Sequence, residues 1–370
     1  MQFAYKSQFS TTMCTFLVTE TIQYYKSRGS NVYALLIDAT KAFDKVKYSK
    51  LFELLINKNI CPLILRLLLN MYLINTAVVS WNGAISTDFS VTNGVKQGGV
   101  LSPYLFVVYI NPLIESLRKS GVGYMMGSLI ANVFVYADDL IILSPTVTAL
   151  QILVNKCEKY GQEFKLQFNP NKCYLLIFTE KKDDVRNVKI TICGEHVKVV
   201  EKEHHLRHVL GTKKDLTSID PSIQDMKMRT NIIVNQFNSI SNGSKIQLFN
   251  SQCMSLCGSQ LWNLQDEKVE ELCVTWRKCL RYLLGLNVRT RSYILPYIMN
   301  TFSIVDVIME RQMNFYIQLH NHPSRLISDF MKNTLISNSS YTVTNINSFI
   351  NKFKILYTDI FIAIRKRLRH

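Results

Sequence analysis

Short apolar runs rich in β-branched residues alternate with stretches of helical spacing through the first 200 positions of the chain. VYALLID at 32–38 has the pattern of a buried strand. YSKLFELLINKN at 48–59 predicts a helix, and a second helix is expected to begin at Pro62, since proline suits a first helical turn. NTAVVSWNGAISTDFSV at 75–91 predicts a hairpin, because its central Asn-Gly pair favours a type I′ turn.

A longer helix is predicted over SPYLFVVYINPLIESLRKSG, residues 102–121. Ser102 is expected to cap its N-terminus, with Pro103 in the first helical position and Gly121 as its stop. Pro112 predicts a kink or a break partway along this helix, because proline removes one helical hydrogen bond.

VFVYADDLIIL at 133–143 predicts a hairpin of two apolar strands, with Asp138 and Asp139 at the turn. A helix is expected to follow at roughly 146–160, and then two further strands in CYLLIF and VKITIC. Because strands and helices alternate from 30 to 200, this half predicts an α/β or α+β domain with one sheet.

From residue 220 onward the apolar positions follow the helical period alone. Three segments fit it: 223–240, 245–262 and 268–286. Trp262 and Trp276 are expected in the core of these helices. We place the boundary between the two regions near 205–222, where charged and turn residues gather. The predicted fold class is α+β: an antiparallel sheet with packed helices, followed by an all-α region.

Composition narrows the class of protein. The chain has 370 residues, of which 48% are hydrophobic and 19% charged, so it can bury two or three cores and is not a disordered tail. Its formal net charge of +16 predicts a polyanionic partner, nucleic acid first and an anionic membrane surface second. The basic excess is larger after residue 180, which makes the second half the better candidate to contact a phosphate backbone.

The N-terminal MQFAYKSQFSTT lacks the apolar segment of a secretory signal, and no stretch reaches the roughly 18 apolar residues of a membrane helix. The nine cysteines are therefore expected to be reduced thiols of an intracellular protein in the cytoplasm, the nucleus or both. His204, His205 and His208 lack further ligands at zinc spacing, so we expect them at the surface or in contact with nucleic acid.

The adjacent carboxylates Asp138 and Asp139 are the first candidate for chemistry. Two like charges in an apolar environment are unfavourable unless something neutralises them, and Mg²⁺ prefers carboxylate and phosphate oxygens. An exposed turn with two solvated aspartates is the alternative. Asp38, at the end of a predicted buried strand, supplies a third carboxylate, unless it is only a helix N-cap; Asp44 is expected to be structural.

GVKQGGVLSPYLF, residues 94–106, lies between the two acidic sites. Gly98 and Gly99 allow the backbone to approach a ligand closely, and Gln97 can hydrogen-bond a base or a sugar. The Gln-Gly-Gly triplet alone is weak evidence for a ligand-binding site. It becomes stronger evidence because it lies between two acidic sites and directly before a Ser-Pro helix start.

In chain order, LLIDATKAFD, GVKQGGVLSPYLF and VYADDLIIL resemble the three central palm motifs of reverse transcriptases. The AFD, the YIN after the Ser-Pro pair, SLCGSQLW and WRKCLRYLLGL resemble non-LTR, LINE-type retrotransposon polymerases in particular. The resemblance extends over about residues 1 to 320. It implies a right-hand polymerase palm with partial fingers, followed by an all-α, thumb-like domain.

The resemblance implies a catalytic role for four residues. Asp38, Asp138 and Asp139 match the aspartates that hold two Mg²⁺ ions, with Mn²⁺ as the alternative ion. Lys172 in FNPNKC matches a lysine that donates a proton near the departing pyrophosphate; a surface lysine is the alternative.

The resemblance also implies contacts to nucleotide and primer. Ala39, Gln97 and Gly98 match residues at the incoming nucleotide, and Tyr136 matches an aromatic residue near the primer end. Phe43 matches a steric gate that selects dNTPs by excluding a ribose 2′-hydroxyl, with a core phenylalanine as the alternative.

Two segments depart from the family pattern. The fingers motif Q-x-G-F is represented by Gln2, Ala4 and Tyr5, without its glycine, and we expect most of the fingers to lie upstream of this chain. In the expected primer-grip turn, HHLRHVLG, Leu206-Arg207 replaces a Leu-Gly pair. An arginine is unfavourable there if the backbone requires a positive φ.

The expected domains are partial fingers at 1–30, a palm with the catalytic core at 31–204, a helical thumb or connection at 205–320 and a C-terminal helical tail at 321–370. Three basic residues on one thumb helix could contact a template–primer duplex: Arg277, Lys278 and Arg281. A solvated helix face is the alternative.

The resulting hypothesis is an RNA-directed DNA polymerase core of a non-LTR retrotransposon, with an RNA template, a DNA primer and dNTPs as partners and no membrane. Two alternatives stay open. The chain could be an inactive nucleic-acid-binding remnant of a mobile element, or a relative of the group II intron reverse transcriptases.

Overall fold

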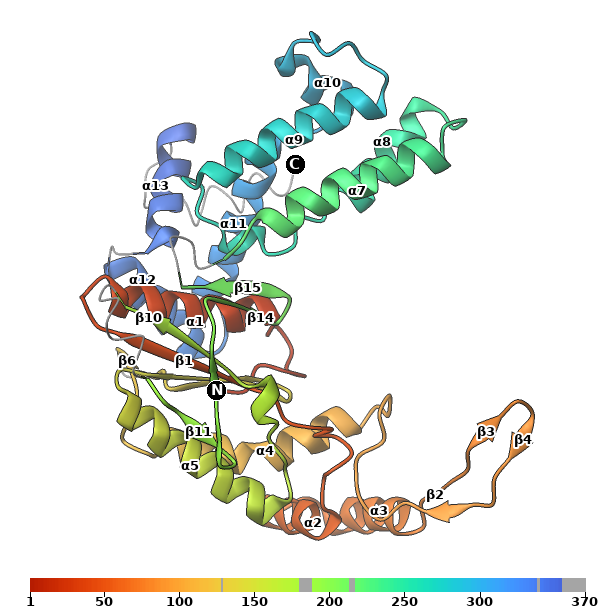
Figure 1. The fold of residues 1–370 in the computed structure, drawn as a ribbon, viewed down its shortest axis with the longest axis vertical. Coiled ribbons are helices and arrows are strands. Elements are labelled where there is room, and N and C mark those ends of the chain that lie inside the picture. The colour runs from red at the N-terminus through yellow and green to blue at the C-terminus, as the bar shows by residue number, and fades with distance from the viewer. Residues whose placement is uncertain (128, 180–187, 213–216, 338–339, 355–370) are drawn as a thin grey trace. The chain divides into compact units, whose positions relative to one another are not determined.

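A computed structural model of the chain describes residues 1–127, 129–179, 188–212, 217–337 and 340–354 (Figure 1). The chain divides into two compact units, Met1–Leu206 and Arg207–His370. The first unit combines a sheet with helices and the second is mainly helical, so the predicted α+β class is confirmed.

One five-stranded sheet forms the centre of the first unit. Its spatial order is β13-β10-β1-β9-β8, and all neighbours are antiparallel except β10 and β13. The strands are β1 Val32–Ile37, β8 Val133–Tyr136, β9 Asp139–Ser144, β10 Tyr174–Phe178 and β13 Lys198–Val199. The middle strand β1 is buried along its whole length, as its uninterrupted apolar sequence predicts.

Helices cover both faces of this sheet. Figure 1 shows α4 (Ser102–Arg118) and α5 (Val147–Phe164) on one face and α1 (Thr11–Lys26) on the other. Side chains of β1 alternate between the faces, and Tyr33, Leu35 and Ile37 pack into the core that α4 and α5 share. The next helices in the chain after β1 are α2 Tyr48–Asn57 and α3 Pro62–Leu73, as predicted.

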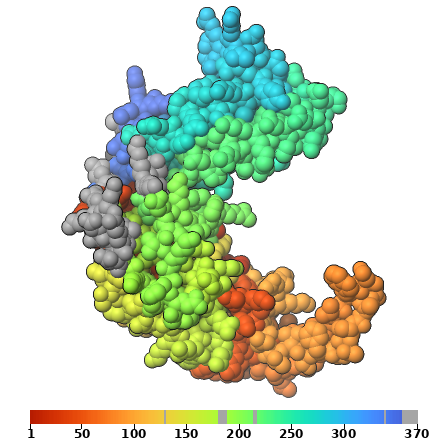
Figure 2. Space-filling model, in the orientation of Figure 1, coloured from red at the N-terminus to blue at the C-terminus, as the bar shows by residue number. Residues whose placement is uncertain are grey.

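Short hairpins complete the first unit. The predicted type I′ turn is confirmed, because Asn82 and Gly83 have φ angles of 46° and 82° between β3 (Ser80–Trp81) and β4 (Ala84–Ile85). This hairpin projects from the first unit in Figure 2 and leaves its large apolar side chains exposed. The remaining short strands are β2 Thr76–Ala77, β5 Phe89–Ser90, β6 Met125–Met126, β7 Leu129–Ile130, β11 Thr191–Ile192, β12 Glu195–His196 and β14 Lys202–His205.

Helix α4 lacks the predicted cap, and of the kink or break predicted at Pro112 the structure excludes the break. Leu101 is the N-cap residue and Ser102 is already helical, without a side-chain cap. Pro112 does not break the helix, which continues from Ser102 to Arg118. The helix continues past Pro112 because Leu105, Tyr109 and Leu113 anchor one buried face along it.

The second unit is built from helices around one apolar core. Trp262 and Trp276 lie in that core, as predicted, with 2% and 3% of their surface exposed. Its elements are β15 His208–Gly211, α7 Asp220–Gln236, α8 Asn242–Gln252, α9 Glu267–Leu283, α10 Leu295–Met299, α11 Ile304–His320, α12 Arg325–Ser337 and α13 Tyr341–Phe353, with short 3-10 helices at Ser259–Leu261 and Ser292–Ile294.

Two expectations for the region that follows residue 203 were wrong. The predicted helix over 245–262 ends at Gln252, because Leu256 and Gly258 adopt positive φ angles of 42° and 83° that stop the helical path. His205 and His208 are buried rather than exposed, each in a strand beside the unit boundary.

No single helix among the described residues is long and apolar enough to cross a membrane. The bent pair Ser292–Met299 and Ile304–His320 meets that requirement by length and composition only.

Candidate active site

Two acidic segments converge at the end of the central strand. Asp38 follows β1 directly, and Asp139 begins the neighbouring strand β9. Ile37 is opposite Leu140 in the antiparallel ladder, so the next step along both strands brings Asp38 opposite Asp139. Both residues line one cavity of about 410 Å³. The sheet register therefore brings together carboxylates that lie a hundred positions apart in the sequence.

The turn between β8 and β9 consists of Ala137 and Asp138, with Tyr136 opposite Asp139. The predicted turn is thus shifted by one residue, since Asp139 already belongs to the strand. Ala137 has a φ of 59°, in the left-handed region that costs a residue other than glycine roughly 1–2 kcal/mol. Strained residues of this kind concentrate at functional sites, where surrounding contacts hold them in place.

The environment of the turn disfavours ionised carboxylates. The pKa of Asp138 is raised by burial and then by the charge of Asp38, although its own backbone N–H opposes the shift. The pKa of Asp139 is raised to about 6 by lost hydration, then by the charges of Asp138 and Asp38. No ion pair among the described residues includes any of these three carboxylates. Within the described part of the chain, their negative charge is therefore not neutralised by an ion pair.

This donor set fits a hard divalent cation. Among the described residues, no three His, Cys, Asp or Glu side chains are already arranged to hold a metal ion by themselves. Mg²⁺ does not need such a cage, because it binds through one or two carboxylates and keeps water and substrate phosphates as its other ligands. Asp38 and Asp139 line a cavity, and the charges of neighbouring carboxylates raise the pKa of Asp138 and Asp139, so this arrangement matches that requirement.

Lys172 lines the same cavity as Asp38 and Asp139. It is the last residue of a 3-10 helix, η1 (Pro170–Lys172), and its side chain is exposed. Asn169, the residue before this helix, donates its backbone N–H to the carbonyl of Asp38 at 3.1 Å. The end of β1 therefore fixes the position from which Lys172 reaches into the cavity. Its role as a proton donor stays a prediction.

Three residues of β14 that sequence reasoning did not assign to the catalytic site also line the cavity: Glu203, His204 and His205. They lie far along the chain from the palm motifs, and the two histidines begin the expected primer-grip turn at 204–211. The contact between β14 and β10 brings them to the end of the sheet.

Ala39 and Phe43 follow Asp38 in the loop after β1. Ala39 is buried and bridges to Phe168 on the segment before η1. Phe43 is half-buried, and its ring stacks on Phe106 with centroids 4.5 Å apart. This contact agrees with the core alternative for Phe43, and neither residue lines the 410 Å³ cavity. The steric-gate role therefore stays a prediction.

Gln97 and Gly98 lie in an exposed loop. Gln97 donates from Nε2 to Oδ1 of Asp44 at 3.1 Å, which gives Asp44 the structural role that its sequence position predicts. Gly98 has a φ of 79°, and no described atom lies within 4 Å of the point where a Cβ would be, so its backbone faces open space. Contact with an incoming nucleotide stays a prediction for both residues.

The basic residues of α9 have partners inside their own unit. Arg277 pairs with Glu270 at 2.7 Å, and Arg281 donates to the carbonyl of Thr290 at 2.8 Å. Lys278 is exposed and forms no ion pair with a described residue. The structure thus gives the two arginines a structural role beside the predicted phosphate contact.

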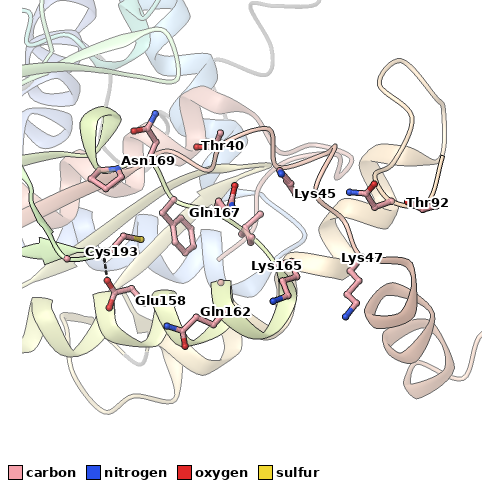
Figure 3. Close-up of a pocket in the computed structure, with 16 residues that line it drawn as sticks. Thr40, Lys45, Lys47, Thr92, Glu158, Gln162, Lys165, Gln167, Asn169 and Cys193 are labelled. Carbon is pink, nitrogen blue, oxygen red and sulfur yellow. Dashed lines mark hydrogen bonds between the residues drawn. The ribbon is translucent and has the colours of Figure 1, made fainter. Parts of the chain in front are cut away.

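A second cavity, of about 1260 Å³, lies beside the loop that follows β1 (Figure 3). Three lysines that form no ion pair with a described residue line it: Lys45, Lys47 and Lys165. Glu158, the carboxylate among the described lining residues, accepts a hydrogen bond from the backbone N–H of Cys193. The cavity is therefore positively charged, and the KVK triplet at 45–47 is the sequence signal that could have indicated it.

The backbone at Leu206-Arg207 does require positive φ angles. Leu206 and Arg207 have φ angles of 50° and 68°, so the backbone does adopt the left-handed region where the family has a glycine. An arginine there is less favourable than glycine, roughly by 1 kcal/mol.

Comparisons with known proteins agree with these motifs. The family model described as reverse transcriptase (RNA-dependent DNA polymerase) matches residues 1–214. The Pol polyprotein of the R2DM element of Drosophila melanogaster is 30% identical over 158 residues, which cover 43% of this chain and 15% of that protein. The probable RNA-directed DNA polymerase of the X-element of Drosophila melanogaster is 22% identical over 312 residues, covering 80% and 33%.

The chain thus spans a third or less of the length of these two relatives. A solved structure of apo telomerase from Candida tropicalis is similar with a TM-score of 0.44 and 13% identity, covering 98% of this chain and 57% of that one. Because the family model spans more than half of the sequence, including Asp38 and the turn before Asp139, this chain belongs to the reverse transcriptase family.

Proposed function

We propose that this chain is the RNA-directed DNA polymerase core of a non-LTR retrotransposon, which adds deoxynucleotides to a primer 3′-hydroxyl on an RNA template. The observation that carries the proposal is the convergence of three carboxylates in a chain of this family: Asp38 and Asp139 line one cavity, and the charges of Asp138 and Asp38 raise the pKa of Asp139. The first unit would supply the palm and the second unit the thumb.

Asp38, Asp138 and Asp139 are the residues that would hold two Mg²⁺ ions, with Mn²⁺ as the alternative ion. Bound divalent ions lower the pKa of a primer hydroxyl and neutralise the charge of the triphosphate. The protein contributes rigid carboxylates, because Asp139 belongs to β9 and Asp38 continues β1, and both strands pair on both sides. Rigid donors of this kind need no rearrangement during the reaction.

Lys172 would donate a proton to the leaving pyrophosphate, since it lines the same cavity as Asp38 and Asp139. Its ammonium group is also a point charge that favours phosphate oxygens. Ala39, Phe43, Gln97 and Gly98 would surround the nucleotide, with Phe43 selecting dNTPs.

The nucleic-acid partners would be bound mainly through charge. The net charge is +16, and Lys45, Lys47 and Lys165 concentrate positive charge beside the loop that carries Asp38 to Phe43. Lysines without ion pairs can contact phosphates without first breaking an internal interaction. We therefore include this lysine cavity among the template or primer contacts, together with Tyr136 and Lys278.

The test is primer extension by the purified chain on an RNA template, run beside Asp138→Asn. Asp88→Asn is the matched control, because Asp88 is an exposed aspartate outside the cavity. The proposal expects extension by the wild type and by Asp88→Asn, and none by Asp138→Asn. RNA binding by all three proteins without extension by any of them would instead favour the inactive nucleic-acid-binding remnant.

A further inference from the structure

The first three residues of the chain lie alongside β8, the strand that leads into the Ala137–Asp138 turn. Gln2 bridges to Val135 in parallel orientation. The backbone N–H of Phe3 donates to the carbonyl of Val135 at 2.9 Å, and the N–H of Val135 donates to the carbonyl of Met1 at 2.8 Å. These bonds fix Gln2 in register with the turn.

The carboxamide of Gln2 holds both backbone polar groups of Ala137. Its Oε1 accepts the N–H of Ala137 at 3.1 Å, and its Nε2 donates to the carbonyl of Ala137 at 3.3 Å. Oε1 also accepts the N–H of Ala4 at 3.0 Å, which fixes the orientation of the amide. Gln2 is 3% exposed, so water does not compete effectively for these groups.

Ala137 is the residue of the turn that most needs such support. Its φ of 59° is in the left-handed region, which an alanine avoids without outside contacts. The carbonyl of Ala137 belongs to the same peptide plane as the N–H of Asp138. A contact that fixes this carbonyl therefore also fixes the plane from which the Asp138 side chain projects.

We propose that Gln2 is a positioning residue that holds the Ala137–Asp138 turn in its left-handed conformation and thereby orients the carboxylate of Asp138. The hydrogen bonds of the Gln2 side chain go to backbone groups of Ala137 and Ala4, so Gln2 acts through Ala137. The claim that Gln2 holds the turn does not depend on the proposed function. The expected effect of Gln2 on polymerisation rests on the proposed function.

Only an uncharged amide of this length satisfies all three contacts. A glutamate has no N–H to donate to the carbonyl of Ala137 and would carry a buried charge. A methionine fills a similar volume but leaves the N–H and the carbonyl of Ala137 without their partners. Gln2→Met is therefore the informative substitution, because it removes the hydrogen bonds and keeps the packing.

Gln151 offers a matched control within the same unit. Its Nε2 donates to the carbonyl of Thr191 at 2.9 Å, and its Oε1 accepts the N–H of Thr191 at 3.0 Å. Gln2 and Gln151 thus each hold the backbone N–H and carbonyl of one residue. Thr191, however, lies in β11 and does not line the 410 Å³ cavity that contains Asp38 and Asp139. Gln151→Met removes the same kinds of bond without touching the turn.

The first measurement is hydrogen–deuterium exchange, followed by mass spectrometry of peptides that cover residues 133–144. In Gln2→Met we expect exchange at the turn to accelerate by about tenfold or more, because a buried N–H loses its acceptor. Gln151→Met should leave exchange at the turn unchanged. Equal exchange at the turn in Gln2→Met and the wild type would overturn the proposal.

The second measurement is steady-state primer extension together with melting temperature. Gln2→Met should lower kcat by about tenfold or more and leave KM for the template–primer within about twofold, because positioning acts on the reacting state. Gln151→Met should retain the wild-type kcat. An equal loss of kcat in both variants would mean that only general stability is affected and would refute the positioning role.

The two readouts separate the two proposals. If the wild type does not extend primers, the proposed function fails, and the exchange experiment still decides whether Gln2 holds the turn. If the wild type is active and the turn exchanges normally in Gln2→Met, the positioning role fails alone.

Discussion

Ile37 and Leu140 are opposite each other in neighbouring antiparallel strands, and an aspartate adjoins each of them at the same end of the sheet. Successive side chains of a strand point to opposite faces, so Asp38 and Asp139 share the face that Ile37 and Leu140 do not use. A shift of this pairing by one residue would separate the carboxylates. The register of one strand pair is therefore a requirement for the candidate active site.

Replacing Asp139 is expected to have opposite effects on activity and stability. Asp139→Asn should reduce primer extension by about 10³-fold or more, because it removes a proposed metal ligand. It should also raise the melting temperature at pH 7.5, since the pKa of Asp139 is raised to about 6 and its ionised form is unfavourable in the folded state. The gain should shrink as the pH falls from 6 toward 3.8, where wild-type Asp139 becomes protonated. A lower melting temperature at pH 7.5 would contradict this explanation.

Lys172 gives a prediction about the leaving group. Lys172→Met should lower kcat by about 10²-fold while leaving the affinity for the template–primer within a few-fold, because proton donation contributes only during the reaction. Lys198→Met serves as the control, since Lys198 is an exposed lysine of β13 that does not line the cavity. If Lys172→Met lowered the affinity for the template–primer by the same factor as kcat, Lys172 would contribute to binding and not to proton donation.

The lysine cavity gives a prediction about salt. Replacing Lys45, Lys47 and Lys165 together by glutamine should reduce the slope of log K against log salt for single-stranded RNA by about 2. Fluorescence anisotropy over a salt series measures this slope. A triple variant of exposed lysines outside the cavity, Lys58, Lys119 and Lys159, has the same net charge and should change the slope less. Equal slopes for the two triple variants would exclude a specific contact at the cavity.

His208 predicts acid sensitivity of the second unit. Burial lowers the pKa of His208 from 6.5 to about 4, so between these values the unfolded chain binds a proton that the folded protein does not. Stability from this residue is therefore complete above pH 6.5 and is lost as the pH falls to 4, by on the order of 3 kcal/mol. Urea unfolding across this range should show the loss, and His208→Gln should flatten it. Exposed His196, replaced in the same way, should have no such effect.

Gly258 packs directly against His208. Its φ is +83°, and an added Cβ would lie 2.8 Å from Nδ1 of His208. Gly258→Ala should therefore destabilise the protein by about 2–4 kcal/mol, from backbone strain together with steric overlap. Gly285 also has a positive φ, 62°, but no described atom within 4 Å of such a Cβ, so Gly285→Ala should show the strain alone. Urea unfolding of both variants measures the difference, and equal losses would exclude the overlap.

Local sequence patterns predicted most elements of the first unit. The apolar run at 32–38, the Asn-Gly turn and the proline at 62 each depend on neighbouring residues, and each matches the structure. The resemblance of the palm motifs also implied that Asp38 would meet the Asp138–Asp139 pair, and the register of β1 and β9 brings Asp38 opposite Asp139.

Features that depend on distant partners were not predictable. The burial of His205 and His208, the place of His204 in the cavity and the contact between Gln2 and Ala137 all involve residues far apart in the chain. No periodicity or turn signal in a single sequence reports such contacts.

The central position of β1 has a consequence for synthesis on the ribosome. This strand leaves the exit tunnel before its two sheet neighbours, β9 and β10, which end at Ser144 and Phe178. A nascent chain must therefore keep the apolar VYALLI segment unpaired until translation has passed β10. Such late pairing is slow and leaves an aggregation-prone apolar strand exposed. We therefore expect chaperones that bind nascent chains to increase the yield of folded enzyme.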